Sequence, residues 1–170
     1  MGISILAVSL PEELLKDAVW HLQQARTFEG DQANCFLLWR EVRSAIMFAV
    51  TAVEALFNMA ATEHVARHPD LPSPIRDHLL EQESRVNREG AVEQRFRLVP
   101  LEDKISVWTR IITGNVFDKS DEVWRRFVKA KDFRNALMHY RPSSSTVYNE
   151  GTVATAKDAI ESCRAIIERY

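Results

Sequence analysis

Apolar residues recur every three or four positions along most of the chain, the spacing that places them on one face of an α-helix. Prolines, glycines and capping residues divide this pattern into segments. The resulting predicted helices cover residues 11–28, 34–67, 75–87, 100–113, 120–140 and 151–169. The second of these is the longest, and its middle is apolar nearly all round, which is typical of the central helix of a bundle.

The stretches between these helices are predicted connections. Residues 68–74 contain three prolines, which cannot lie inside a helix. The charges of residues 88–99 indicate an exposed connection, and Thr146-Val147-Tyr148 could form a short extended piece. We therefore predict an all-α fold, an up-and-down helical bundle of about five to six helices with one long central helix. At 170 residues the chain is expected to form a single domain over residues 1–170.

The composition is that of a soluble globular protein, with 46% hydrophobic and 27% charged residues. Glu54 interrupts the longest apolar run, residues 45–61, and argues against a membrane span. Residues 3–10 are apolar but lack the basic flank of a signal peptide, so a cytoplasmic location is expected. Cys35 and Cys163 are too few for a disulfide scaffold and are expected to be reduced and buried.

Reactive side chains are concentrated near the end of the predicted fifth helix, in Arg134, Asn135 and His139. Arginine offers planar, bidentate donors for phosphate, and histidine exchanges a proton near neutral pH. Together they are a minimal set of groups for metal-independent RNA cleavage through the 2′-hydroxyl. The carboxamide of Asn135 could orient the imidazole or bond to the scissile phosphate.

The surroundings of this cluster are basic, although the whole chain has a net charge of −2. From Lys119 to Arg141 there are seven Lys or Arg residues and three acidic ones, which favours local attraction of RNA. Arg134 and His139 are five residues apart, so a regular helix sets them about 140° apart around its axis. Either the helix end unwinds before Pro142, or a two-fold dimer brings two copies of this helix end around one cleft.

A purely structural interpretation of the same residues stays open. Arg134 could pair with an acid such as Glu54 or Asp132, while His139 caps carbonyls at the helix end. Glu54 lies on an apolar helix face and needs a partner, for which Arg134 and Arg43 are the candidates. His64 and His68 have a spacing that could hold a metal, but no third ligand is evident, so no metal and no cofactor is predicted.

The string Phe-Arg-Asn-Ala-Leu-Met-His-Tyr-Arg-Pro over residues 133–142 resembles the signature of HEPN domains (higher eukaryotes and prokaryotes nucleotide-binding). Their hallmark is R-x4-6-H with a polar residue directly after the arginine. Residues 49–58 are similar to the central helix of that superfamily, and the last helix fits its order. The resemblance implies an α-helical bundle that is usually homodimeric, with the motif of both subunits lining one cleft. Many members are metal-independent endoribonucleases acting as toxins, in defence or in RNA processing.

By this resemblance Arg134 and His139 would be the catalytic pair, with Asn135 as the supporting polar residue. Lys131, Tyr140 and Arg141 flank this group and are secondary candidates for contact with RNA. Glu54 and Asp132 are secondary candidates for a supporting role behind the catalytic groups.

The resemblance also suggests partners. One toxin subgroup carries H-x-Y, and a nucleotidyltransferase antitoxin modifies its tyrosine. Here Tyr140 directly follows His139, one residue short of that pattern. RNA, a second copy of the chain and such an antitoxin are therefore the expected partners. The alternative is a catalytically inactive HEPN-like module that binds nucleotide, RNA or a protein.

Overall fold

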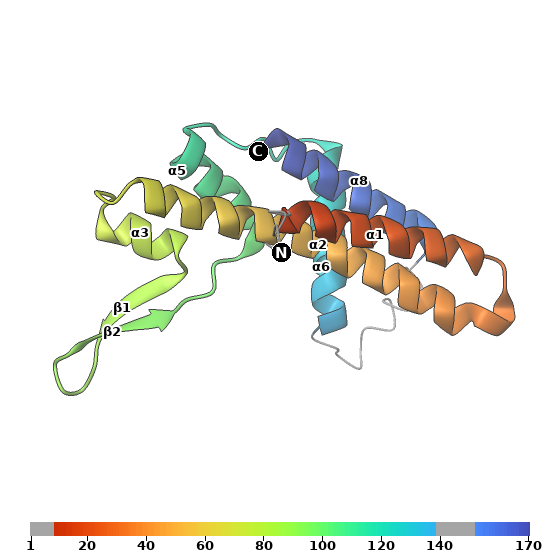
Figure 1. Cartoon of the computed structure of the whole chain (residues 1–170), viewed down its shortest axis with the longest axis horizontal. Helices are drawn as coiled ribbons and strands as arrows, with labels where there is room; N and C mark the ends of the chain where they lie inside the picture. Colours follow the sequence, from red (N-terminus) through yellow and green to blue (C-terminus); the bar gives the residue numbers. More distant parts are fainter. Residues whose placement is uncertain (1–8, 139–151) are drawn as a thin grey trace, which may run out of the picture. The chain divides into compact units, whose positions relative to one another are not determined.

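The computed structural model describes residues 9–138 and 152–170 and confirms the predicted all-α class, since helices dominate and the described sheet has only two strands (Figure 1). The chain forms two compact units. Unit 1 consists of the described parts of residues 1–53 and 118–170, and unit 2 of residues 54–117. The long helix α2 (Cys35–Arg67) contributes to both. The expectation of one domain over residues 1–170 stays a prediction.

Unit 1 is built around α8 (Val153–Arg169), which packs against both α1 (Leu10–Thr27) and α6 (Glu122–Met138). The first part of α2 runs beside α1 and follows it through a short 3-10 turn, Gln32–Asn34 (Figure 1). The apolar stripe predicted for the last helix is its buried face. Its buried residues are Ala156, Ala159, Ile160, Ser162, Cys163 and Ile166.

The helix starts follow local chemistry. Pro11 stands in the first turn of α1, where a missing N–H costs nothing. The hydroxyl of Thr152 accepts from the Thr155 amide at 3.1 Å and caps α8. At α6 the cap is Asp121, because its Oδ1 accepts from the Trp124 amide at 2.9 Å.

The α2 helix confirms the predicted long helix, with 33 residues against the expected range 34–67. Its fully buried residues keep the helical period and are Val42, Ala45, Ile46, Ala49, Val50, Ala52, Val53, Phe57 and Ala61. Within the described chain, residues 32–67 form the one helix long and apolar enough to cross a membrane, a test that core helices of soluble proteins also pass. The finding is compatible with a soluble protein, and the cytoplasmic location stays a prediction.

Unit 2 contains the end of α2, the short helix α3 (Ser73–Leu79), a hairpin of β1 (Gln82–Val86) and β2 (Val92–Phe96), and a helical segment over residues 101–113. That last segment is α4 (Leu101–Asp103), a π-helical turn (Lys104–Trp108) and α5 (Thr109–Thr113). Gly114 ends it with a φ of 78°, as its position in the sequence predicted.

The predicted helix over residues 75–87 is wrong in its second half. The helix stops at Leu79, and residues 82–86 form a strand paired with residues 92–96, in the stretch expected to be only a connection. The hairpin turns at Asn87, whose side-chain oxygen accepts from the Ala91 amide at 2.9 Å, and Gly90 supplies a φ of 80°. Cross-strand pairing stabilises this segment, and such pairing is not visible when each of the two segments is considered alone.

Candidate functional site

The sequence-predicted site begins in the last turn of α6. The helix is regular through Met138, and Arg134 and Asn135 are both half-buried. Arg134 lies seven residues after Phe127, a core residue, so the guanidinium continues the buried face of the helix. His139, Tyr140 and Arg141 lie outside the described residues. The structure therefore gives the setting of one half of the predicted catalytic group.

Lys131 and Asp132 lie one turn before this end. Lys131 Nζ is 2.9 Å from Asp132 Oδ1, and the lysine side chain is only 11% exposed while that of the aspartate is largely in solvent. Most of the lysine thus packs inside unit 1, with its ammonium drawn toward a surface carboxylate. The proposed roles of Lys131 toward RNA and of Asp132 behind the site stay predictions.

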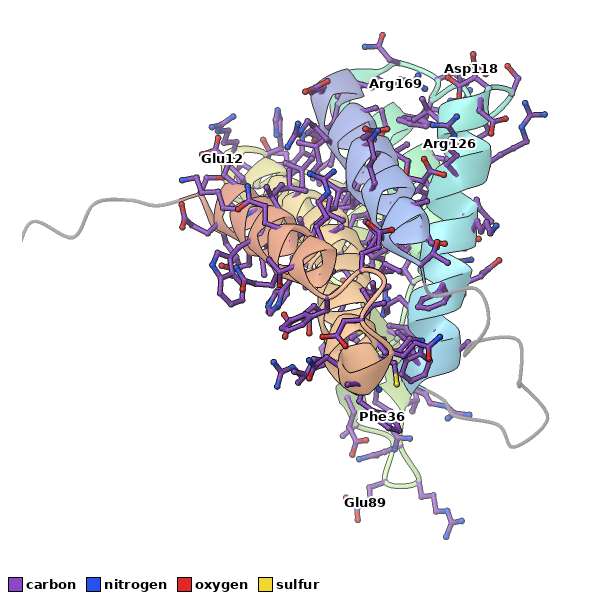
Figure 2. All side chains as sticks on the ribbon, turned by 90° about the vertical axis from the view of Figure 1, so that its right-hand side faces the viewer. Glu12, Phe36, Glu89, Asp118, Arg126 and Arg169 are labelled. Carbon is purple, nitrogen blue, oxygen red and sulfur yellow. The ribbon has the colours of Figure 1, made fainter. Side chains whose placement is uncertain are left out.

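The basic residues of α6 are largely paired with acids. Arg125 is 2.7 Å from Glu122, and Arg126 reaches both Glu122 at 3.3 Å and Asp158 of α8 at 3.6 Å. Figure 2 shows Arg126 on α6 on the side next to α8. Because each pair offsets a positive charge, the local attraction for phosphate is weaker than the count of Lys and Arg implies.

An ion pair fixes the opposite end of α6. Arg169, at the end of α8, lies 2.6 Å from Asp121, which caps the start of α6. The two helices are therefore antiparallel, and Figure 2 shows Arg169 beside the segment that precedes α6, at Asp118. The hydrogen bond from Arg169, followed by that from the Trp124 amide, lowers the pKa of Asp121. This pair anchors the helix that carries Arg134.

Glu54, predicted to support the site, contacts Lys104, a residue that the sequence did not single out. Within unit 2 Lys104 Nζ lies 3.8 Å from Glu54 Oε1 and 2.9 Å from Glu81 Oε2, and it donates to the side-chain oxygen Oδ1 of Asn58 at 2.8 Å. The ammonium also lies 5.1 Å from the ring centre of Trp108. The role of Glu54 behind the catalytic groups stays a prediction.

A pocket of about 550 Å³ opens beside this cluster in unit 2. Its lining includes the polar residues Asp77, His78, Glu81 and Arg97. Among the described residues, His78 Nε2 is buried without a hydrogen-bond partner. Acidic, basic and imidazole side chains are thus collected on one surface of unit 2. Sequence reasoning passed over His78 because a single histidine on a polar helix carries no spacing signal.

In unit 1, a cluster of polar side chains joins α1 and α2. His21 Nδ1 lies 2.6 Å from Glu41 Oε2, and Arg40 lies 2.6 Å from Glu41 Oε1. Burial alone would raise the pKa of Glu41, but the bonds from His21 and Arg40 outweigh it and lower the pKa. The imidazole stacks on Phe48 with ring centres 5.3 Å apart. The contact between His21 and Glu41 therefore connects α1 to α2 and fixes the position of the imidazole.

The thiols differ from each other. Cys163 is fully buried, as expected, and its surroundings raise the pKa of its thiol far above the ordinary value. The expectation that Cys35 is buried is wrong: it is exposed at the start of α2, where the helix has not yet entered the core. Over the described ranges 9–138 and 152–170, no three His, Cys, Asp or Glu side chains cluster as metal ligands do.

The comparisons with known proteins add no relative. No family model, no curated protein and no solved structure matches the chain.

Proposed function

We propose that the protein is a metal-independent endoribonuclease of the HEPN type, with a composite site at a homodimer interface. The observation that carries the proposal is the sequence string Arg134-Asn135-x3-His139, whose first five residues form the end of the basic helix α6. The half-buried setting of Arg134 and Asn135 supports it, because side chains held by packing lose less entropy when they bind a transition state.

The chemistry assigns one role to each residue. The 2′-hydroxyl of the RNA attacks the adjacent phosphorus, the bond to the 5′-oxygen breaks, and a 2′,3′-cyclic phosphate forms. His139 accepts the proton of the 2′-hydroxyl, and His139 of the second copy donates a proton to the leaving 5′-oxygen. Arg134 stabilises the charge that develops on the phosphate oxygens, and Asn135 orients the imidazole or bonds to the phosphate.

The proposed activity also suggests a role in the cell. A toxin, defence or RNA-processing role in the cytoplasm fits an RNA endonuclease. A nucleotidyltransferase antitoxin is the expected regulator in the toxin case, with Tyr140 as the residue it would modify. Lys131, Tyr140 and Arg141 would contact the RNA strand on either side of the cleaved bond.

A catalytically inactive module is the second candidate. The observation that favours it is the neutralised surface of α6, where Arg125, Arg126 and Lys131 all contact carboxylates. Such a module would bind nucleotide, RNA or a protein without turnover.

The decisive experiment measures cleavage of a fluorescently labelled single-stranded RNA by the full chain in the presence of a chelator. His139→Ala is expected to lower the rate by about 10²–10⁴-fold, the usual contribution of a general acid or base. The matched control is Arg125→Ala, which removes an exposed arginine of the same helix and should leave the rate nearly unchanged. Equal rates for the wild type and His139→Ala would exclude the ribonuclease, and RNA binding without turnover would favour the inactive module.

A further inference from the structure

The β1–β2 hairpin has one face that is charged and one that is partly apolar. Successive strand residues point to opposite faces, so the register places Glu83 opposite Arg95 and Arg85 opposite Glu93 on one of them. On the other face lies the apolar hairpin patch, which we define as Val86, Val92, Phe96 and the following Leu98. These four side chains are between 65% and 72% exposed. A lone two-stranded hairpin of this kind is marginally stable in water.

The two edges of the hairpin differ in their surroundings. Within the described residues the sheet has two strands, so β1 and β2 each form one edge. Helix α3 packs against β1, and Ser84 Oγ of β1 donates to Asp77 of α3 at 3.2 Å. Figure 1 shows the hairpin extending away from α3, with β2 returning toward the helical segment 101–113.

The hydrogen bonds at both ends of the hairpin show which backbone groups of β2 face away from β1. The Arg97 amide donates to the Glu81 carbonyl at 2.7 Å, and the Asn87 amide donates to the Ala91 carbonyl at 2.9 Å. Bonded and non-bonded pairs alternate in an antiparallel ladder, so the odd-numbered residues bond across the hairpin. The amides and carbonyls of Val92, Gln94 and Phe96 therefore point outward.

We propose that β2 pairs with β2 of a second copy of the chain, antiparallel across a two-fold axis at Gln94, to form a four-stranded sheet. In this register Gln94 faces Gln94 of the second copy, and Val92 faces its Phe96. These are the residues whose amides and carbonyls point outward, so each pair exchanges two hydrogen bonds. The same contact made from both sides closes the dimer.

The charges select this register. With the axis at Gln94, Glu93 faces Arg95 of the second copy. Together with the register within each hairpin, one row across the sheet then reads Glu83, Arg95, Glu93, Arg85, in which the signs alternate. A shift to either neighbouring register with the same bonding pattern places Glu93 opposite Glu93 or Arg95 opposite Arg95, and like charges directly opposite are destabilising.

The apolar residues favour β2 over β1 as the pairing strand. Pairing through β2 brings Phe96 next to Val92 and Val86 of the second copy in one row, an aromatic residue beside two β-branched ones. Pairing through β1 about Ser84 would place Gln82 opposite Val86, and α3 already lies against that strand. The expected occupant of the β2 edge is thus a second copy of this chain.

The first test compares two proline variants of the full chain by analytical ultracentrifugation over a concentration series. Gln94→Pro removes the central outward amide of β2 without removing a backbone hydrogen bond between β1 and β2. It should raise the dimer dissociation constant at least about tenfold. Ser84→Pro makes the same backbone change on the outer side of β1 and is the control. Both variants lose the bond from Gln94 to Ser84 at 2.9 Å, and Ser84→Pro also loses the bond from Ser84 to Asp77 at 3.2 Å. An equal effect of the two variants, or no effect of Gln94→Pro, overturns the inference.

The second test does not depend on a proline variant that folds. Gln94→Cys in a Cys35→Ser background should form an intermolecular disulfide under mild oxidation, because paired residues there lie about 5.5 Å apart between Cα atoms. Ser84→Cys in the same background should not. Failure of Gln94→Cys to cross-link overturns the β2 contact. A cross-linked dimer without RNA cleavage instead counts against the proposed ribonuclease alone, so the two proposals fail separately.

Discussion

Lys104 Nζ lies 2.9 Å from Glu81 Oε2 although the lysine side chain is only 1% exposed. A buried ammonium is stable only when its charge is paired and its hydrogen bonds are made. Glu81 pairs with the ammonium from an unusual backbone conformation. Its φ of 53° is the only positive value of a non-glycine residue in the described chain. Its other carboxylate oxygen accepts from the Val99 amide at 2.9 Å. One glutamate thus connects the hairpin to the helical segment 101–113.

Removal of this ammonium should destabilise unit 2 strongly. Lys104→Ala leaves Glu81 without its buried partner, and breaking such a pair costs about 3–5 kcal/mol. The free energy of unfolding by urea measures this loss. Lys16→Ala, which removes an exposed lysine paired with Glu13 on α1, is the control and should leave the unfolding midpoint nearly unchanged. Similar midpoints for both variants would contradict the structural role of Lys104.

The bond between His21 and Glu41 should make stability depend on pH. The pKa of Glu41 is lowered in the folded state, so its contribution is present above the ordinary value of 4.5 and is lost as the pH falls through the lowered pKa. Glu41→Gln should therefore cost about 1.5–3 kcal/mol at pH 7, the usual value for hydrogen bonds to charged groups. The difference from the wild type should shrink toward pH 3.

Denaturation curves of both proteins between pH 3 and pH 7 check this prediction. Glu29→Gln, at an exposed glutamate of the turn after α1, is the matched control and should follow the wild type at every pH. A cost of Glu41→Gln that does not change with pH would mean that the carboxylate charge is not what stabilises the contact.

The two thiols should react at very different rates. Cys35 is exposed, whereas Cys163 is fully buried with a pKa raised by its apolar surroundings. A chromogenic disulfide reagent should therefore titrate one thiol quickly in the native protein and the second only after denaturant is added. Cys35→Ser should abolish the fast phase, and a fast phase that persists in this variant would contradict the burial of Cys163.

The variant Arg134→Lys distinguishes two roles of Arg134, stabilisation of the transition state and a structural ion pair. Lysine keeps the charge but loses the planar pair of donors that suits phosphate. If Arg134 stabilises the transition state, RNA cleavage should fall at least about tenfold while the melting temperature changes little. Cleavage and melting are measured on the same preparation. A lower melting temperature with cleavage unchanged per folded molecule would favour a structural ion pair.

Local signals in the sequence were sufficient for most helices. Pro11 and Gly114 mark boundaries that the structure places within one or two residues, because capping and breaking depend only on nearby backbone groups. The stripe of α2 likewise follows from its period alone. Arg134 and Asn135 stood out for their chemistry, and the structure adds their half-buried setting at the end of α6.

The features that the sequence missed depend on residues far apart in the chain. Nothing local distinguishes Lys104 from an exposed lysine, and only the fold brings Glu81, Glu54 and Asn58 around it. The same holds for the hairpin. Glu83 and Arg85 lie opposite residues of unlike charge, Arg95 and Glu93, only because the two strands pair. The amino-acid sequence alone thus determined where most helices form, because helical periodicity and capping are local, while the tertiary structure decided which charges are buried and which strands pair.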